Sequence, residues 1–473
     1  MVGVPGRSKS CSTCRARRKG CDKKHPCGQC IRIGVECGGY ERQTIFVHQE
    51  VKADSVLHIT PYRKPQALDI TNSIDLIRSA KAEMYISAFL SEYLPTGTRA
   101  AQYPYDFVEI AHRMYPSDKA VELSLLSLAL CASRNFNPGL EAYGRALCKL
   151  QTAIRFEQRS DSILTASKLL SLFEMFYGSS VLNLLSQGLN WHGHLEGQLA
   201  IIRARGPGAY RFGTSHQLFV DARYPHIIRA IKDRTRYPLN SLEWRTKPWE
   251  KHPKTSKDRL YDMLADLSEI LADIDEARCQ QVGISRMIRL GEIMSACRDL
   301  DQTLKRWCEE AGPLKDFLDD NGTLLGPRGP DDFALAHLTT VSWTLHIILY
   351  ATICSLLQPT PDEYPAEIDP RPYLHKATKA LPYFWMPGAG SNGAYLGAFL
   401  WGLCMHIVLS SPKLFAQEWD EFHDQVFMPE MMTTVLSFLA SLHRTCGSPA
   451  FSHVNGVEGL QLRAMSWLGG DLL

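Results

Sequence analysis

The sequence predicts a small cysteine-rich amino-terminal domain followed by a large all-α domain. Six of the fourteen cysteines fall between residues 11 and 37. At 473 residues, the chain is too long for one hydrophobic core. From about residue 72 the apolar residues recur at helical spacing, whereas alternating strand patterns are scarce. Apolar residues make up 45% of the chain and charged residues 22%, as in ordinary folded proteins.

The amino-terminal segment contains the unit C-x2-C-x6-C twice, joined by residues 22–26. Its cysteines are Cys11, Cys14, Cys21, Cys27, Cys30 and Cys37. A structural zinc ion takes four ligands, so two ions need eight ligand positions, which six sulfurs fill only if two of them bridge both ions. The spacing therefore predicts a cluster of two Zn²⁺ ions. Free thiols gathered by chance, or one zinc ion with two spare cysteines, fit a doubled array less well.

Metal binding is expected to stabilise this segment. Ile31, Ile33 and Val35 are its only large aliphatic residues, so the metal must supply most of its folding free energy, and a chelator should unfold it. The start of the chain has no apolar stretch behind basic residues, which predicts no secretory signal and a reducing compartment. The remaining cysteines occur singly, and we expect buried, inert thiols at Cys131, Cys148, Cys279, Cys297, Cys308, Cys354, Cys404 and Cys446.

Charge is concentrated at the amino terminus. Residues 1–42 hold ten Lys or Arg and three acidic residues, a net charge of +7, whereas the whole chain carries +2 and the other residues therefore −5. This distribution is typical of a polyanion-binding module attached to a larger domain. The run 15–20 adds four cations to the helix predicted after the first cysteine pair, and Gly20 is expected to end that helix. A short cationic helix can enter the major groove, where Arg or Lys reads guanine. Alone, such a run is more typical of a solvated surface or an import signal; beside the metal cluster it predicts DNA binding.

Residues 11–37 resemble the zinc binuclear cluster domain of fungal transcription factors. The resemblance implies a nuclear, sequence-specific transcription factor of the RNA polymerase II type that binds CGG half-sites in double-stranded DNA. It also implies that Cys11 and Cys27 bridge the two ions. Cys14 and Cys21 would complete one ion, and Cys30 and Cys37 the other.

The same resemblance assigns the DNA contacts. Base contacts fall on Arg17 and Arg18, and backbone contacts on Arg15, Lys19 and Lys9. Two positions depart from the family pattern: Gly20 stands where many members have a lysine that helps to read guanine, and Pro26 directly precedes Cys27 in a loop that is often one residue longer. The first departure leaves the half-site preference open, and the second leaves open the register of the loop.

We divide the chain into a cluster domain at 1–42, a linker at 43–71 and an all-α domain at 72–473. Pro61 and Pro65 mark the linker. No apolar heptad pattern persists for three heptads after it, so a dimerising coiled coil is not predicted. Two helical faces are predicted in the large domain, one formed by Ile74, Ile77, Met84, Tyr85, Ala88 and Phe89 before Pro95, and one by Leu260, Leu264, Leu267 and Leu271.

Within this domain, residues 141–150, the W-x-x-H-x-x-G pattern at 191–197 and the Arg-Gly-Pro at 205–207 more weakly resemble the helical regulatory domain of the same fungal family. The resemblance implies regulation, contact with transcriptional co-regulators and effector sensing. An alternative function therefore makes the large domain a small-molecule effector receptor whose output is the DNA-binding domain. The uncharged, aromatic-rich stretch 383–401 motivates this alternative.

Other functional classes lack support. The glycine pattern G-x-G-x-x-G at 388–393 follows prolines instead of a strand, so a nucleotide site is not expected. The uncharged stretches 333–357 and 380–412 contain many small and polar residues, which favours buried core helices over membrane spans. His192 and His194 have no nearby carboxylate or thiol and make a poor metal site. No hydrolase or nucleotidase motif occurs, so no catalytic residue is predicted and the chain is not expected to be an enzyme.

Overall fold

The protein was examined as a computed structural model. It describes residues 10–37 except 23 and 25, then 70–94, 107–156, 160–181, 184–357 except 313, and 364–410, together with Glu418 and Phe438. The chain divides into two compact units, Met1–Gln66 and Ala67–Leu473, which we call the head and the body. Lys9, Cys446 and the predicted linker up to residue 69 lie outside the described residues.

The head contains two short helices, α1 (Ser12–Ala16) and α2 (Gly28–Arg32). The described part of the body is mainly helical. Its α-helices are α3 (Ile70–Tyr93), α4 (Phe107–Met114), α5 (Lys119–Ala132), α6 (Phe136–Arg155), α7 (Asp161–Val181), α8 (Leu184–Arg205), α9 (Gly213–Lys232), α10 (Leu242–Thr246), α11 (Ser256–Cys279), α12 (Ile284–Glu310), α13 (Pro330–Leu357), α14 (Arg371–Ala380) and α15 (Gly390–Ser410). The 3₁₀ helices are η1 (Pro207–Tyr210), η2 (Lys247–Trp249), η4 (Ala366–Ile368), η5 (Leu381–Trp385) and η6 (Pro387–Ala389). Among the described residues, the one pairing of β type is an isolated bridge between Leu318 and Leu324, so the all-α prediction is confirmed for that part of the chain.

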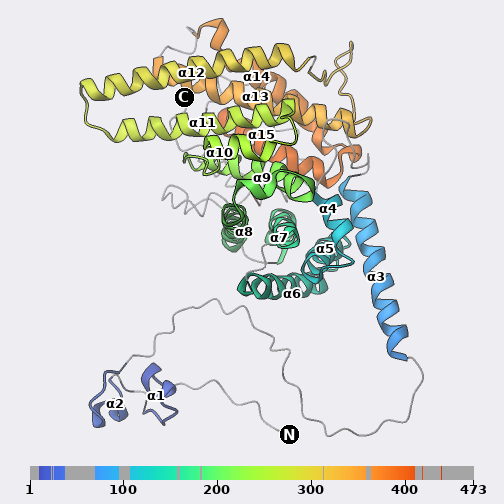
Figure 1. Ribbon diagram of the computed structural model, residues 1–473, viewed down its shortest axis with the longest axis vertical. Helices are drawn as coiled ribbons and strands as arrows, with labels where there is room; N and C mark the ends of the chain where they lie inside the picture. The colour runs from blue at the N-terminus through green and yellow to red at the C-terminus, as the bar shows by residue number, and fades with distance from the viewer. Residues whose placement is uncertain are drawn as a thin grey trace. The chain divides into compact units, whose positions relative to one another are not determined.

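The body has two groups of helices that share one core. Helices α5, α6, α7 and α8 pack on one another on one side, and α11 to α15 pack on one another on the other (Figure 1). Helix α9 contacts α7 and α8 on one side and α11 on the other. A single cluster of buried apolar residues extends through both groups, so the body is stabilised by one continuous core.

Helix α11 follows its sequence pattern closely. A capping box begins it, since the Thr255 side chain accepts the Asp258 N–H and the Asp258 carboxylate accepts the Thr255 N–H. The predicted face is confirmed, because all four of its leucines are buried (Leu260, Leu264, Leu267, Leu271). The buried Arg223 of α9 pairs with Asp262 of this helix and stacks on the Trp249 ring, which joins α9, η2 and α11.

The predicted face of α3 is partly wrong. Met84 and Ala88 are exposed, whereas Ile86, Phe89 and Tyr93 are buried against the body. The buried face is set by the helices that α3 contacts, α5 and α15, and these come from distant parts of the sequence. The apolar spacing in α3 is compatible with more than one stripe, so the choice depended on tertiary packing.

Helix α13 is long and apolar enough by length and composition to cross a membrane. In the body it lies among α11, α12, α14 and α15, and 78% of its most apolar stretch is buried. Its hydroxyl side chains donate to backbone carbonyls of the preceding turn, as Thr340 does to His337 and Thr344 to Thr340. Burial in the body core accounts for the absence of charged residues from 333–357, after the two aspartates of its first turn.

The glycine pattern at 388–393 belongs to a tight connection between η6 and α15. A Cβ atom on Gly393 would lie 2.2 Å from the carbonyl oxygen of Phe384. The glycine therefore permits α15 to approach η5 closely, and a packing role explains the motif without a nucleotide.

The prediction of buried thiols holds for most but not all of the single cysteines. Cys131, Cys297, Cys354 and Cys404 are buried and Cys308 is partly buried. Cys148 and Cys279 are exposed, so the prediction is wrong for these two. Each lies in a helix, Cys148 in α6 and Cys279 at the last residue of α11, and the described residues leave both side chains exposed.

Candidate metal centre

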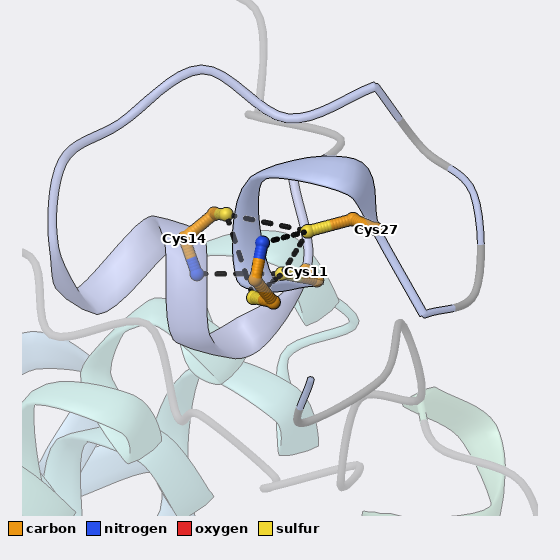
Figure 2. Close-up of side chains that lie close together, drawn as sticks. Cys11, Cys14 and Cys27 are labelled. Carbon is orange, nitrogen blue, oxygen red and sulfur yellow. Dashed lines mark hydrogen bonds between the residues drawn. The ribbon is translucent and has the colours of Figure 1, made fainter. Parts of the chain in front are cut away.

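Four cysteine sulfurs meet in the interior of the head. Cys11 directly precedes α1, which contains Cys14, and Cys27 directly precedes α2, which contains Cys30. Figure 2 shows Cys11, Cys14 and Cys27 close together. The Cys11 and Cys27 sulfurs lie 3.7 Å apart, Cys14 and Cys27 3.5 Å, and Cys11 and Cys30 3.8 Å. A tetrahedral zinc ion with Zn–S bonds of about 2.3 Å holds its sulfurs about 3.8 Å apart, so these separations fit zinc coordination.

The two halves of the head repeat one arrangement with an offset of sixteen residues. The Cys14 N–H donates to the Cys11 sulfur at 3.3 Å, as the Cys30 N–H donates to the Cys27 sulfur at 3.4 Å. Cys21 and Cys37 occupy equivalent places as well. Their sulfurs accept the N–H groups of Cys11 and Cys27, each at 3.4 Å. All six sulfurs are therefore gathered, with Cys11 and Cys27 in matching central positions.

The crowding of these sulfurs disfavours their ionisation unless a cation is present. Burial and the neighbouring sulfurs raise the pKa of Cys14 well above its usual value. Burial, together with Cys27 and Cys11, raises the pKa of Cys30 to about 12. The pKa of Cys11 is also raised, although the N–H of Cys14 lowers it. Thiolates at such separations repel one another, and a divalent metal relieves this repulsion when it displaces the protons.

The described residues of the head form no core besides these cysteines. Its buried residues are the four cysteines Cys11, Cys14, Cys27 and Cys30, whereas Ile31, Ile33 and Val35 are exposed. The aliphatic residues noted in the sequence therefore contribute little burial. The donor set, all thiol sulfur, is of the kind that zinc prefers, so the residues present fit the metal.

Residues 9–45 match the fungal Zn(2)-Cys(6) binuclear cluster domain. The head contains a zinc binuclear cluster domain. It carries two zinc ions, and it marks the protein as a DNA-binding transcription factor of the zinc-cluster type. No curated protein and no solved structure matches the chain. The match covers the head, and the family is one of DNA-binding regulators and not of enzymes.

The cluster domain presents its cations on a turn that follows α1. Arg17, Arg18 and Lys19 are exposed, and α1 ends at Ala16 instead of continuing to Gly20. The Lys19 N–H donates to the Cys14 carbonyl at 2.9 Å, which closes the helix with Arg18 in the left-handed region at φ +52°. The expectation that Gly20 ends the helix is therefore wrong, since the left-handed residue that closes α1 is Arg18, two residues earlier.

The second half of the cluster domain explains this geometry. There the Val35 N–H donates to the Cys30 carbonyl at 3.2 Å, and Gly34 takes the left-handed position at φ +67°. Arg18 lies sixteen residues before Gly34 and so holds the equivalent position in the first half. Because the metal fixes both cysteine pairs in the same way, the first half adopts the same turn without a glycine. Of the other DNA contacts predicted from the sequence, Arg15 lies within α1, and Lys9 lies outside the described residues.

Asp22 was not predicted to matter for the cluster domain. Its carboxylate accepts the Gly28 N–H at 3.0 Å and the Lys24 N–H at 3.3 Å, which ties the loop between the halves to the start of α2. The Gly28 N–H lowers the pKa of Asp22. An aspartate next to a cysteine and shortly before a helix is the sequence signal that could have identified this role.

The body contains a buried polar cluster, formed by α6, α7 and α8, that includes two residues of the weaker resemblance. The Tyr143 hydroxyl donates to the Glu174 carboxylate and lies 3.0 Å from the His194 Nε2. Asn190 donates to the same carboxylate oxygen at 3.1 Å. Glu174 is fully buried, and burial raises its pKa to about 7. Tyr143 and His194 belong to the sequence patterns at 141–150 and 191–197, whereas Glu174 could not be predicted, because an isolated glutamate in an apolar helix gives no motif.

Proposed function

We propose that this protein regulates RNA polymerase II transcription in the nucleus by binding CGG-type half-sites through its zinc cluster. One observation supports this most strongly: six gathered sulfurs brace a short helix that is followed at once by three exposed cations, Arg17 to Lys19. A rigid cationic projection of this size fits the major groove, where Arg reads the O6 and N7 atoms of guanine. Transcription factors with this domain are generally nuclear.

The decisive experiment is selection from random DNA duplexes with the zinc-loaded full-length protein, repeated after strong chelation. We expect enriched sequences that contain CGG and a complete loss of enrichment after chelation. Enrichment of an unrelated sequence would reject the half-site proposal. Enrichment that survives zinc removal would reject the role of the cluster.

The proposed ligand arrangement makes Cys11 and Cys27 the bridging residues. Cys14 and Cys21 complete one ion, and Cys30 and Cys37 the other. The matching central positions of Cys11 and Cys27, with sulfurs 3.7 Å apart, support this assignment. The zinc content of two variants tests this assignment. Cys11→Ser is expected to lose both ions, because a bridging cysteine belongs to both coordination spheres. Cys21→Ser is expected to retain one ion, because it leaves one sphere intact. Equal zinc loss in the two variants would contradict the bridging assignment.

The proposed DNA contacts divide into two kinds. Arg17 and Arg18 read bases, whereas Arg15, Lys19 and Lys9 contact phosphates. Arg17→Ala is therefore expected to weaken binding to CGG sites by about 1–3 kcal/mol and to relax the base preference. Lys19→Ala is expected to weaken binding to all sequences alike. The slope of log affinity against log salt concentration should fall by about one, the amount expected for one lost phosphate contact. The affinities of both variants for CGG duplexes and for scrambled duplexes test this division.

Effector sensing by the body stays a prediction. The aromatic stretch 383–401 that suggested it is packed in the core, since Tyr383, Phe384 and Trp401 are fully buried. Contact with co-regulators likewise stays a prediction. A thermal-shift screen of the full-length protein against metabolites would test effector sensing, with a rise in the body's unfolding temperature as the supporting result.

A further inference from the structure

The hairpin of α11 and α12 ends in an apolar surface that nothing in the described body covers. We define the hairpin tip as residues 277–291. Val282 is 89% exposed, Ile284 78%, Met287 73% and Ile288 60%. A single exposed apolar side chain is ordinary, whereas four within seven residues form a patch of the kind that marks a protein-binding surface.

The exposed residues lie on one side of α12. Ile284, Met287 and Ile288 are spaced i, i+3 and i+4, so they form one ridge along the first turns of the helix. Further along α12 the helix is covered, because Leu290 and Met294 pack against the main core and Ile293 is buried. The packing of α12 against the body therefore does not use the exposed side chains, so a partner could bind them.

The charge of the hairpin tip indicates the kind of partner. Its fifteen residues include three arginines and no Asp or Glu. Arg289 is neutralised by Asp273 and Glu292. Among the described residues, Arg278 and Arg286 have no ion pair with an acidic side chain. A net positive apolar surface thus projects from a chain that, outside residues 1–42, is net acidic.

The acidic residues close to the tip are already paired. Asp273 and Glu276 of α11 both bind Arg236, and Asp275 binds Arg234. They do not offset Arg278 and Arg286. A second copy of the chain that brought its own tip to this surface would place positive charge against positive charge, which disfavours self-association here.

We propose that the hairpin tip binds an acidic amphipathic helix of another protein. The partner's apolar face would pack on Ile284, Met287 and Ile288, and its carboxylates would pair with Arg278 and Arg286. This mode buries a helix ridge in the way that amphipathic segments dock on apolar surfaces. The tip would then serve as a recruitment surface that is independent of DNA binding by the head.

The test measures peptide binding by fluorescence anisotropy with the zinc-loaded full-length protein. The probe is a labelled synthetic helix of about 18 residues, or five turns, with leucine on one face and glutamate elsewhere. A peptide with lysine in place of glutamate and a scrambled glutamate peptide are the matched controls. We expect the amphipathic glutamate peptide to bind at least tenfold more tightly than either control.

Two double variants locate the binding surface. Ile284→Ser with Met287→Ser removes the ridge, and Arg278→Glu with Arg286→Glu reverses the charge. Each is expected to weaken peptide binding at least tenfold with no change in unfolding temperature or DNA affinity. Leu242→Ser, which alters a side chain that is 78% exposed on α10, is the matched control and is expected to bind the peptide normally.

Several results would overturn the proposal. Peptide binding that is unaffected by both double variants would place the surface elsewhere. Dimers that the serine variants dissociate in light scattering would assign the tip to a second copy of the chain. Tip-dependent binding to phosphatidylserine vesicles or to scrambled duplex DNA, with no preference for the glutamate helix, would assign it to a polyanion surface.

Discussion

Arg18 combines a backbone position that suits glycine with a side chain that suits DNA. Its φ of +52° costs an L-residue about 1–2 kcal/mol, and Gly34 avoids this cost at the equivalent place in the second half of the cluster domain. If Arg18 contacts DNA as proposed, its exposed guanidinium would offset this cost in the bound state. We therefore expect the first half of the cluster domain to be less stable than a glycine at position 18 would make it, in return for a cation that can bind DNA.

Arg18→Gly should separate these two roles. The substitution relieves the left-handed strain, so we expect the cluster to retain zinc more strongly, by about 1 kcal/mol. It also removes a cation, so affinity for CGG duplexes should fall. Zinc transfer to a chromophoric chelator and DNA titration measure the two effects. Arg17→Gly serves as the control, because Arg17 does not have a positive φ and should gain no stability.

Glu174 should make the stability of the body depend on pH. Burial raises its pKa to about 7, above the value of about 4.5 for the unfolded chain. The folded state thus holds a proton that the unfolded state releases, so stability is fully present below about pH 4.5 and falls progressively up to about pH 7. Across this range the wild type is expected to lose about 3 kcal/mol of unfolding free energy that Glu174→Gln does not lose, which urea unfolding at a series of pH values would measure.

A matched control for this prediction is Glu141→Gln. Glu141 is exposed on α6, one turn from the same cluster, and its substitution should leave the pH profile unchanged. If Glu174→Gln also keeps the wild-type profile, the buried carboxyl is not the group that titrates.

At the residue scale, the sequence predicted the metal-binding residues better than it predicted the backbone conformation between them. The spacing of the six cysteines was sufficient to predict a metal site, because zinc imposes its own geometry on any chain that supplies the sulfurs. The left-handed turn at Arg18 could not be predicted, since nothing in its side chain favours that conformation. It follows from the repeat of the two metal-bound halves, which becomes evident only when the backbone hydrogen bonds are known.

Helices that pack closely need glycine at their contact, and α15 provides the clearest case. Gly393→Ala would place a methyl group against the Phe384 carbonyl, which cannot move without disturbing η5. We expect a loss of about 1–3 kcal/mol in unfolding free energy, measured by urea denaturation. Gly388→Ala in the same motif is the control, because its Cβ would meet no atom closer than 3.5 Å. Equal effects in the two variants would contradict the packing explanation.

At the element scale, prediction succeeded where a helix had one possible inner face. The leucines of α11 at 260, 264, 267 and 271 define such a face and are all buried. In α3 the apolar residues lie around more of the helix, so local spacing could not distinguish Met84 from Ile86. The neighbours that decide, α5 and α15, are fixed by long-range topology.

The division into head and body predicts that zinc is required for the folding of the head and not for that of the body. Strong chelation should unfold the head, whose buried residues are cysteines, and leave the body folded, because its core is apolar. Limited proteolysis after chelation should therefore release a stable fragment that contains α3 to α15. Restoring zinc should restore DNA binding without any change in the body's thermal transition. Loss of the body's transition on chelation would show that the two units do not fold independently.

The body is closed by a contact between its first and last described helices. The Tyr93 hydroxyl of α3 donates to the Asn392 side chain of α15 at 3.0 Å, across 299 positions of the sequence. During synthesis at about 5–20 residues per second, α3 must wait about 15–60 s for its partner to leave the ribosome. The head needs no such partner and can acquire zinc soon after it emerges. A newly made chain would therefore be able to hold metal well before its body is complete, because α3 can pack on α5 early but meets α15 only at the end.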